Sequence, residues 1–380
     1  MGRSLKSSLA ALIVALFVSG SAIAQISRPP DGGNQKASVT QYLGLVKVTI
    51  DYNSPKVHQP RTGEDRRGKI WGTLVAYGLT DLGFGTCKQC PWRAGANENT
   101  VFTVSHDVKV DGQPLPAGSY GLFMIADPNE WTVIFSKNHT SWGSFFYDQA
   151  DDALRVKVKP QKSDYHEWLT YEFPERNLDK ATVAMKWEDL QIPLTISVDN
   201  MSALYVAEMR NELKNAKGFD WQNYNTAARY ALDNKTDLAE GLKWAQAAVN
   251  ATFVGQENFT SLMTLADLQA ANALDADSKK TREKALNLPR ATPTELHQYA
   301  RMLLTKGDKS EAFRIWELNA KMHPNEWPVN VGLARGHSAL GHYKEALKYA
   351  NLAVKEAPDD ANRKALEAAV KKLEAGQDMN

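Results

Sequence analysis

The C-terminal half of the chain repeats with a period of 34 residues, and this repeat restricts the possible folds more than any other feature. One glycine, one alanine and one proline return at this spacing: Gly307, Ala312 and Pro324 recur as Gly341, Ala346 and Pro358. The apolar residues between them follow helical spacing. Such a period is typical of solenoids, in which each unit buries its apolar face against the next. We therefore expect stacked helical hairpins, with the glycine in the turn and the proline ending the second helix.

The repeat resembles the tetratricopeptide repeat, which has the same period. This resemblance implies a helical repeat domain over residues 200–380, with three or four hairpins within about residues 220–376. Small side chains such as Ala334 and Ala346 would let paired helices approach closely. The unit at 293–324 matches the pattern clearly, whereas earlier units are degenerate. A plain helical bundle is the alternative interpretation.

Before residue 200 the hydrophobic pattern has a period of two, which indicates strands. Turn signals such as Asp111-Gly112 separate short candidate strands. These candidates are 46–52, 101–104, 108–110, 120–125, 131–135, 154–158, 168–173, 182–187 and 192–198. No helical crossover separates them, so residues 45–199 are expected to form an antiparallel β-sandwich or barrel. The chain is thus an α+β multidomain protein, and residues 25–44 are expected to be a flexible tail.

The first 24 residues have the features of a secretory signal peptide. Arg3 and Lys6 precede an apolar run at 9–18, and Ala22-Ile23-Ala24 matches the pattern that signal peptidase requires. The run is shorter than the about 20 residues needed to span a bilayer. We therefore expect cleavage before Gln25, a periplasmic or extracellular location and no membrane span afterwards. An uncleaved membrane anchor is the alternative.

The net charge limits the class of partner. Without the signal peptide the chain has 43 Lys and Arg residues against 44 Asp and Glu residues. A near-neutral chain lacks the basic surface that nucleic acids require, and export disfavours the same partner. The expected partners are an envelope or secreted protein for the helical repeats and a small ligand or glycan for the β domain.

The chain contains only two cysteines, Cys87 and Cys90. In an oxidising compartment they are expected to form a local disulfide that stiffens one loop. A redox dithiol and a metal site are alternatives, but the first needs a helix N-terminus and the second needs two further ligands. Pro91 replaces the histidine of a c-type haem motif. No cofactor and no metal are expected.

The β domain resembles an exported domain-of-unknown-function family, number 2911. The matching stretches together cover most of residues 45–198. They are Tyr52-Asn53-Ser54-Pro55, Lys69-Ile70-Trp71-Gly72-Thr73-Leu74-Val75-Ala76-Tyr77-Gly78, Trp92-Arg93-Ala94-Gly95-Ala96-Asn97-Glu98, Leu115-Pro116-Ala117-Gly118-Ser119-Tyr120, Glu130-Trp131-Thr132-Val133-Ile134, and Trp142-Gly143 with Tyr147-Asp148 and Leu154-Arg155-Val156. The resemblance implies a β-sandwich-like fold, bacterial export and frequent fusion to helical repeats. It supplies no catalytic residues. The segment 79–91, which carries both cysteines, interrupts the family's pattern.

No catalytic signature is present: the chain lacks a Gly-x-Ser-x-Gly elbow, a His-Glu-x-x-His motif and a phosphate-binding loop. Two stretches are candidate ligand-binding sites because they combine aromatic rings with polar groups. Their candidate residues are Trp92, Arg93, Asn97, Glu98, Trp142 and Tyr147. The alternative is structural: the polar groups pair with each other and the rings fill the core.

We therefore expect a non-enzymatic binding or scaffold protein, with the β domain binding a small ligand, glycan or peptide. The second hypothesis is an envelope hydrolase whose site lies around Arg93, Asn97 and Glu98. The third is a thiol–disulfide function of Cys87 and Cys90.

Overall fold

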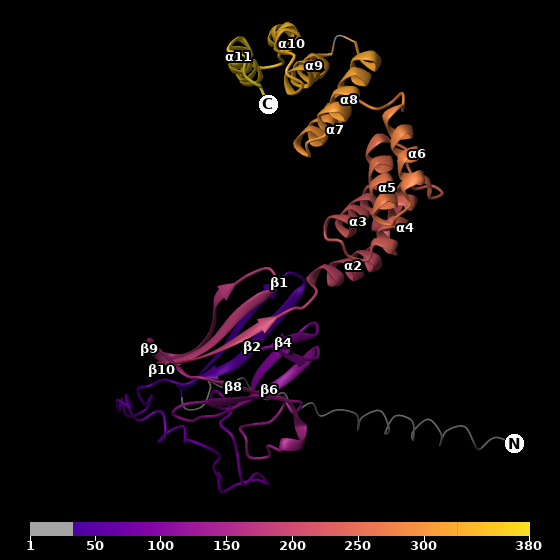
Figure 1. Ribbon diagram of the computed structural model, residues 1–380. Coiled ribbons are helices and arrows are strands. Elements are labelled where there is room, and N and C mark those ends of the chain that lie inside the picture. Colours follow the sequence, from indigo (N-terminus) through magenta and orange to yellow (C-terminus); the bar gives the residue numbers. More distant parts are fainter. Residues whose placement is uncertain (1–32, 325) are drawn as a thin grey trace, which may run out of the picture. The chain divides into compact units, whose positions relative to one another are not determined.

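The computed structural model describes residues 33–324 and 326–380, which divide into a β domain ending at Met201 and a helical unit, Ser202–Asn380 (Figure 1). The expected signal peptide and its cleavage site lie outside the described residues. Within the described part, no helix is both long enough and apolar enough to cross a membrane.

The β domain contains two antiparallel sheets. The six-stranded sheet has the order β1-β2-β3-β6-β7-β8, and the four-stranded sheet has the order β5-β4-β10-β9. The strands are β1 (Gln35–Leu43), β2 (Val46–Ser54), β3 (Thr100–Val104), β4 (Val108–Val110), β5 (Gln113–Leu115), β6 (Gly118–Ile125), β7 (Trp131–Ser136), β8 (Asp152–Val158), β9 (Gln161–Arg176) and β10 (Lys180–Ser197). A 3₁₀ helix, Gln149–Asp151, precedes β8. This arrangement confirms the predicted antiparallel β domain.

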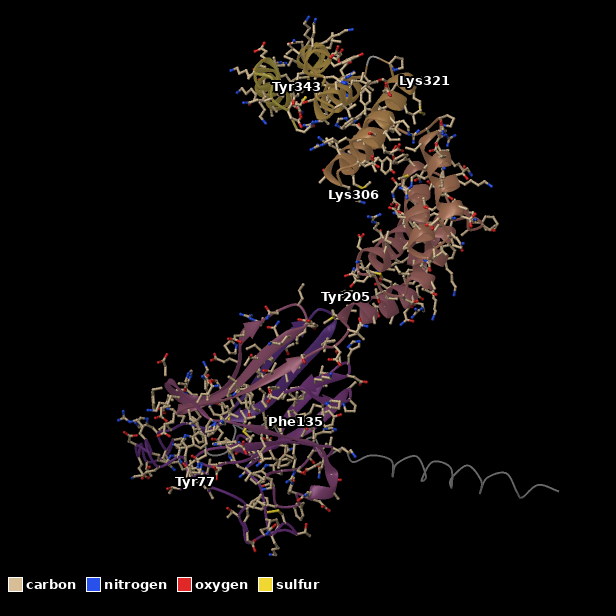
Figure 2. All side chains as sticks on the ribbon, in the orientation of Figure 1. Tyr77, Phe135, Tyr205, Lys306, Lys321 and Tyr343 are labelled. Atoms are coloured by element: carbon tan, nitrogen blue, oxygen red, sulfur yellow. A yellow bond between two sulfur atoms is a disulfide. The ribbon has the colours of Figure 1, made fainter. Side chains whose placement is uncertain are left out.

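The core lies where the apolar faces of the two sheets meet. Tyr52 on β2 packs edge-to-face on Tyr171 on β9, with ring centroids 4.9 Å apart. The Ser54 hydroxyl donates a hydrogen bond to the Leu169 carbonyl at 2.7 Å, which joins the same two strands. Figure 2 shows Phe135 inside the domain, fully buried, and Tyr77 at its surface, 45% exposed. The apolar residues of the alternating sequence pattern therefore lie on the buried face of each strand.

One boundary prediction was wrong. Residues 35–43, expected to belong to a flexible tail, form strand β1, which pairs with β2 from Gln35↔Ser54 to Leu43↔Val46. Gly44, with φ +53°, makes the two-residue hairpin turn. The strand was missed because it lies at the edge of the sheet and is mostly exposed, so its hydrophobic alternation is weak.

A second correction concerns β10, since the two candidate strands 182–187 and 192–198 form one strand. The interruption between them is an irregularity of the ladder with β9, where the register shifts on both sides of Glu188. Glu188 has φ +57°, a left-handed conformation that is uncommon for a residue other than glycine. The break in the sequence pattern therefore marks a bulge and not a turn.

The helical unit contains hairpins of adjacent antiparallel helices. The helices are α2 (Met201–Glu212), α3 (Trp221–Asp233), α4 (Leu238–Asn250), α5 (Phe259–Ala271), α6 (Asp275–Leu286), α7 (Pro293–Thr305), α8 (Lys309–Met322), α9 (Trp327–Ala339), α10 (Tyr343–Glu356) and α11 (Asp360–Glu374). A 3₁₀ helix, Ala216–Phe219, follows α2. The pairs α3–α4, α5–α6, α7–α8 and α9–α10 pack against each other.

The residues of the 34-residue repeat have matching environments in this unit. Gly307 and Gly341 lie in the turns before α8 and α10 with φ +91° and +79°. Ala312 and Ala346 are fully buried one turn into those helices. The glycines make turns that other residues adopt at a cost, and the alanines allow close helix packing.

Candidate functional site

The two cysteines close a loop that packs on the segment between β7 and β8. Cys87 and Cys90 are joined by a disulfide and both are buried. Cys90 pairs with Thr80 through two backbone hydrogen bonds of 3.0 and 3.1 Å. The Cys87 amide donates to the Phe145 carbonyl at 2.9 Å. Residues 79–91 therefore form a closed loop that is attached to the aromatic segment 142–147.

A glycine allows this attachment. Gly85 has φ +78°, and a Cβ at this position would lie 2.3 Å from the Phe145 carbonyl oxygen. Any side chain would separate the two segments. The next residue on the N-terminal side, Phe84, packs edge-to-face on Phe145 and on Phe146, with ring centroids 5.5 and 5.9 Å apart.

The two segments together present what we call the aromatic surface: Phe84, Trp142, Phe145 and Phe146. Phe84, Trp142 and Phe146 are 63%, 58% and 52% exposed. Trp142 and Phe145 are parallel, with an angle of 6° between ring planes and 6.1 Å between centroids. Exposed aromatic rings that contact one another form an apolar patch, which is typical of a binding surface.

Trp142 is held in place by the predicted Arg93–Glu98 loop. The Arg93 guanidinium lies 5.5 Å from the centre of the Trp142 ring and donates a hydrogen bond to the Asn97 carbonyl at 2.9 Å. Burial lowers the pKa of Arg93. The Trp142 backbone pairs with Glu98. Gly143 leaves no room for a side chain between Arg93 and Phe145.

Glu98 lines a pocket that does not include Arg93. That pocket, about 370 Å³, includes Lys36, Asn53 and Glu98 in its lining. Lys36 Nζ lies 3.1 Å from Glu98 Oε1, and the Asn53 amide donates to Oε2 at 2.9 Å. The pKa of Glu98 is lowered, first by a hydrogen bond from the backbone amide of Glu98 itself, and then by Lys36 and Asn53. The Asn97 amide oxygen accepts a hydrogen bond from Asn34 at 3.0 Å.

Tyr147 lies beside the disulfide loop, in a polar pocket next to the aromatic surface. The polar pocket, about 470 Å³, is lined by Leu79, Thr86, Cys87, Lys88, Gln89, Tyr147, Asp148, Gln149 and Arg155. Tyr147 donates to Asp152 at 2.9 Å, and Arg155 donates to the Tyr147 hydroxyl at 2.7 Å. Burial and then Asp152 raise the pKa of Tyr147. These bonds fix the tyrosine and the arginine relative to each other.

Trp92 is the candidate that faces the interior. Its ring packs on Trp71, Trp131 and Trp187, with centroids 5.9, 6.3 and 6.2 Å away. Its indole N–H donates to the Gly95 carbonyl at 3.2 Å. The structure thus brings Arg93, the Asn97 backbone and Trp142 together, and separates the Glu98 carboxylate and Trp92 from this group. Tyr147 lies in the polar pocket with Cys87 and Arg155.

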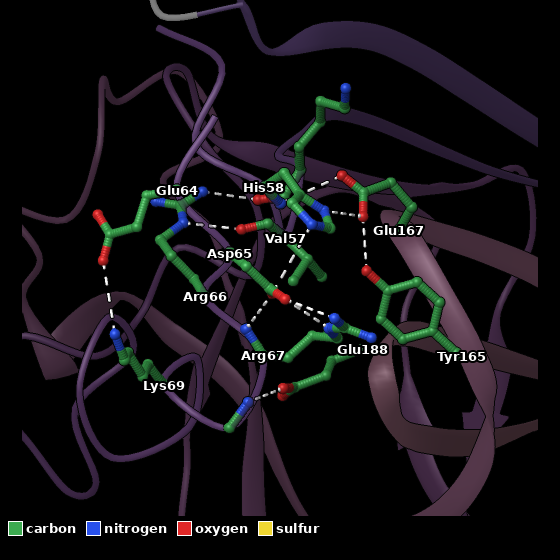
Figure 3. A network of polar contacts seen from close by, with 12 residues as sticks. Val57, His58, Glu64, Asp65, Arg66, Arg67, Lys69, Tyr165, Glu167 and Glu188 are labelled. Carbon is green, nitrogen blue, oxygen red and sulfur yellow. Dashed lines mark hydrogen bonds and ion pairs between the residues drawn. The ribbon is translucent and has the colours of Figure 1, made fainter. Parts of the chain in front are cut away.

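A polar network elsewhere in the β domain was not predicted (Figure 3). His58 Nδ1 lies 2.8 Å from Glu167 Oε2, and Tyr165 donates to the same oxygen at 2.6 Å. Asp65 lies 3.8 Å from His58 Nε2 and accepts two hydrogen bonds from Arg67, at 2.8 and 2.6 Å. Partial burial and then Glu167 raise the pKa of Tyr165 to about 12.

This network was missed because it joins two groups, residues 58–67 and residues 165–167, that are about 100 positions apart along the chain. The structure shows β9 bulged at this point, since Tyr165 and Glu167 have no one-to-one partners on β10. Among residues 33–324 and 326–380, no group of three or more His, Cys, Asp or Glu side chains is arranged to hold a metal ion.

The comparisons with known proteins concern the β domain. A search of curated proteins finds none that matches this chain. Residues 34–196 match the model of a family described as a protein of unknown function (DUF2911). The matched residues span β1 to β10 and exclude the helical unit, whose resemblance to tetratricopeptide repeats stays a prediction. The β domain, residues 34–196, is therefore a DUF2911 domain.

Proposed function

We propose that this chain is an exported binding protein whose β domain binds a glycan at the aromatic surface. The observation that carries this proposal is the exposure of Trp142, Phe84 and Phe146 beside a polar pocket. The apolar face of a sugar ring packs on an aromatic ring, while its hydroxyls need hydrogen-bonding groups at the edge. Both requirements are met within two adjoining segments, 79–91 and 142–149.

Fixed geometry favours binding because little freedom is lost when the ligand arrives. Trp142 is held by Arg93 and by the backbone pairing with Glu98. Tyr147 and Arg155 are linked to each other and to Asp152. Arg155, Gln89 and Gln149 supply planar polar groups that suit hydroxyl recognition. Arg93 and the Asn97 backbone support this site, and Trp142 and Tyr147 contact the ligand.

A glycan array probed with the chain from Gln25 onward tests this proposal. We expect binding to a restricted set of glycans, and we expect Trp142→Ala to weaken it by about 2 kcal/mol, or roughly 30-fold in Kd. Phe219→Ala is the matched control, since Phe219 is an exposed aromatic residue of the helical unit. Binding of apolar peptides without glycans would assign the surface to the peptide class instead. Equal loss in both variants, or no ligand of either class, would contradict the proposal.

The two other hypotheses have weaker support. A hydrolase that used Glu98 as an acid would need a raised pKa, whereas the pKa of Glu98 is lowered by its hydrogen bonds and by Lys36. A thiol–disulfide function would need an accessible sulfur, whereas Cys87 and Cys90 are buried. Turnover that disappears in Glu98→Gln, or reductase activity lost in the double serine variant, would revive the respective hypothesis.

For the helical unit we propose a protein partner that presents an acidic segment. Arg301 on α7 and Arg335 on α9 form no ion pair with another described residue, and each raises the positive potential near His297. Burial, Arg335 and Arg301, in that order, lower the pKa of His297 to about 4. Arg335 donates a hydrogen bond to the Asn380 side chain at 3.1 Å and lies near Asp378, so its charge is partly offset. The remaining positive charge of the two arginines favours an anionic partner. Crosslinking of the full chain in the envelope should capture a partner, and Arg301→Glu should abolish capture, while Lys364→Glu on α11 should not.

Export itself belongs to the same proposal, because an envelope glycan and an envelope protein are accessible only after translocation. N-terminal sequencing of the protein recovered from the periplasm or the medium should start at Gln25. A chain retained in the cytoplasm with Met1 would contradict it.

A further inference from the structure

We propose that the β domain has a second site, which binds a small organic ammonium cation in a pocket around Glu188. This Glu188 pocket has a volume of about 390 Å³ and is lined by Arg67, Gly68, Trp71, Tyr77, Tyr165, Glu188 and Asp189. None of these residues lines the polar pocket described above, so the two sites share no lining residue. The volume suits a small molecule.

Glu188 is placed in the pocket by an irregular backbone. It lies on β10 opposite the bulged part of β9, with a left-handed φ of +57°, and the residue is only 5% exposed. One carboxylate oxygen, Oε1, accepts a hydrogen bond from the Gly68 amide. The other, Oε2, has no hydrogen-bond partner among the described residues. Strained positions of this kind are concentrated at functional sites.

The negative charge of the pocket is not neutralised by the protein. Neither Glu188 nor Asp189 forms an ion pair with any residue in the described part of the chain. The pocket's own cation, Arg67, donates two hydrogen bonds to Asp65 (Figure 3). Lys69, the next cation along this segment, pairs with Glu64 at 3.6 Å. Burial, followed by the charges of Asp189 and Asp65, raises the pKa of Glu188.

The walls of the pocket are aromatic rings with little freedom. Trp71 packs edge-to-face on Trp131 and Trp187, with centroids 5.1 and 5.6 Å away. Tyr77 lies against Gly72, where a Cβ would come within 2.6 Å of the ring. Tyr165 is fixed by its 2.6 Å hydrogen bond to Glu167.

Aromatic rings around a carboxylate that has no ion-pair partner among the described residues match the chemistry of an ammonium group. The faces of the rings attract a cation that has shed its water, and the carboxylate adds a direct charge interaction. An alkylated ammonium is favoured over a metal ion because its methyl groups also bury against the rings. The described residues, moreover, contain no arrangement of three or more acidic, His or Cys side chains suited to a metal.

Calorimetric titration of the full chain with choline chloride tests this proposal, with sodium chloride as the ionic-strength control. We expect saturable choline binding that falls at least about tenfold in Glu188→Gln. Because Glu188 is nearly buried, Tyr77→Ala provides a second variant at an exposed position, and it should weaken choline binding similarly. Trp142→Ala, in the aromatic surface, should bind choline normally.

Three results would overturn the proposal: heat with choline that sodium chloride reproduces, binding that Glu188→Gln and Tyr77→Ala leave unchanged, or binding that Trp142→Ala abolishes. Preference of the pocket for a neutral saccharide over choline would also overturn it. Loss of glycan binding alone, with choline binding intact, would refute the function proposed above and leave the ammonium site standing.

Discussion

The two units of the molecule use their aromatic residues differently. In the helical unit, Trp316 is fully buried between helices, and the exposed rings of Phe219 and Phe253 make no contact with another aromatic ring in the described residues. In the β domain, by contrast, exposed rings such as Trp142 and Phe146 are grouped on adjoining loops. Single exposed rings are ordinary, whereas a group of them marks a surface that meets another molecule. We infer that the helical unit uses its rings for stability and the β domain uses some of its rings for binding.

The largest expected effect is a loss of stability in the helical unit that leaves glycan binding unchanged. Trp316→Ala should destabilise the helical unit by about 3–5 kcal/mol, because it empties a fully buried site against which Gly332 packs closely. Glycan binding by the β domain should be unchanged, since the aromatic surface contains no residue of the helical unit. Thermal unfolding of the full chain, monitored by far-ultraviolet circular dichroism, together with glycan titration measures both. A loss of glycan affinity in Trp316→Ala would contradict this difference between the two units.

Removing the disulfide should weaken glycan binding, and it should destabilise the protein less than Trp316→Ala does. Replacing Cys87 and Cys90 with serine opens a ring of four residues, which the chain-entropy model values at about 2 kcal/mol. We expect glycan affinity to fall because the loop then holds Phe84 less firmly. Urea unfolding and titration of the same variant measure the two effects. Unchanged affinity would show that the aromatic surface does not need the closed loop.

The smallest expected effect concerns Glu188. Burial raises its pKa in the folded state, so the folded protein binds this proton more tightly than the unfolded chain does. Stability from this group is therefore lost as the pH rises from the ordinary carboxyl range through the raised pKa. Glu188→Gln should remove this dependence and stabilise the protein at neutral pH by on the order of 1 kcal/mol.

Urea unfolding across roughly pH 4 to 8 checks this prediction. Asp164→Asn is the control, because Asp164 is an exposed carboxylate of β9 that does not line the Glu188 pocket. If the glutamine variant is less stable than the parent at neutral pH, Glu188 has a stabilising partner that contradicts the ammonium pocket.

How much could be predicted from the sequence depended on how local each feature is. The helical hairpins were predictable because Gly307 and Ala312 act through neighbours within one repeat. Most strands were predictable from alternation, but β1 was not, since an edge strand needs only one partner and little apolar burial. The pattern break at Glu188 could be read as a turn because a bulge and a turn interrupt alternation in the same way.

The candidate site was predicted only in part, for a related reason. Trp142 and Tyr147 were identified from local composition, and the structure places Trp142 on the aromatic surface and Tyr147 in the lining of the polar pocket. The contact of Phe84 with Phe145 and that of His58 with Glu167 join residues about 60 and 109 positions apart. No periodicity or motif encodes such contacts, because they depend on how the loops pack.

The affinity of the best-binding glycan for three forms of position 142 tests the central claim most directly. We expect the order wild type, then Trp142→Phe, then Trp142→Ala, because a phenyl ring keeps part of the stacking surface and alanine keeps none. Calorimetric titration of the three chains gives the order, with thermal unfolding to confirm that all are folded. Equal affinities across the three folded chains would contradict glycan binding at the aromatic surface.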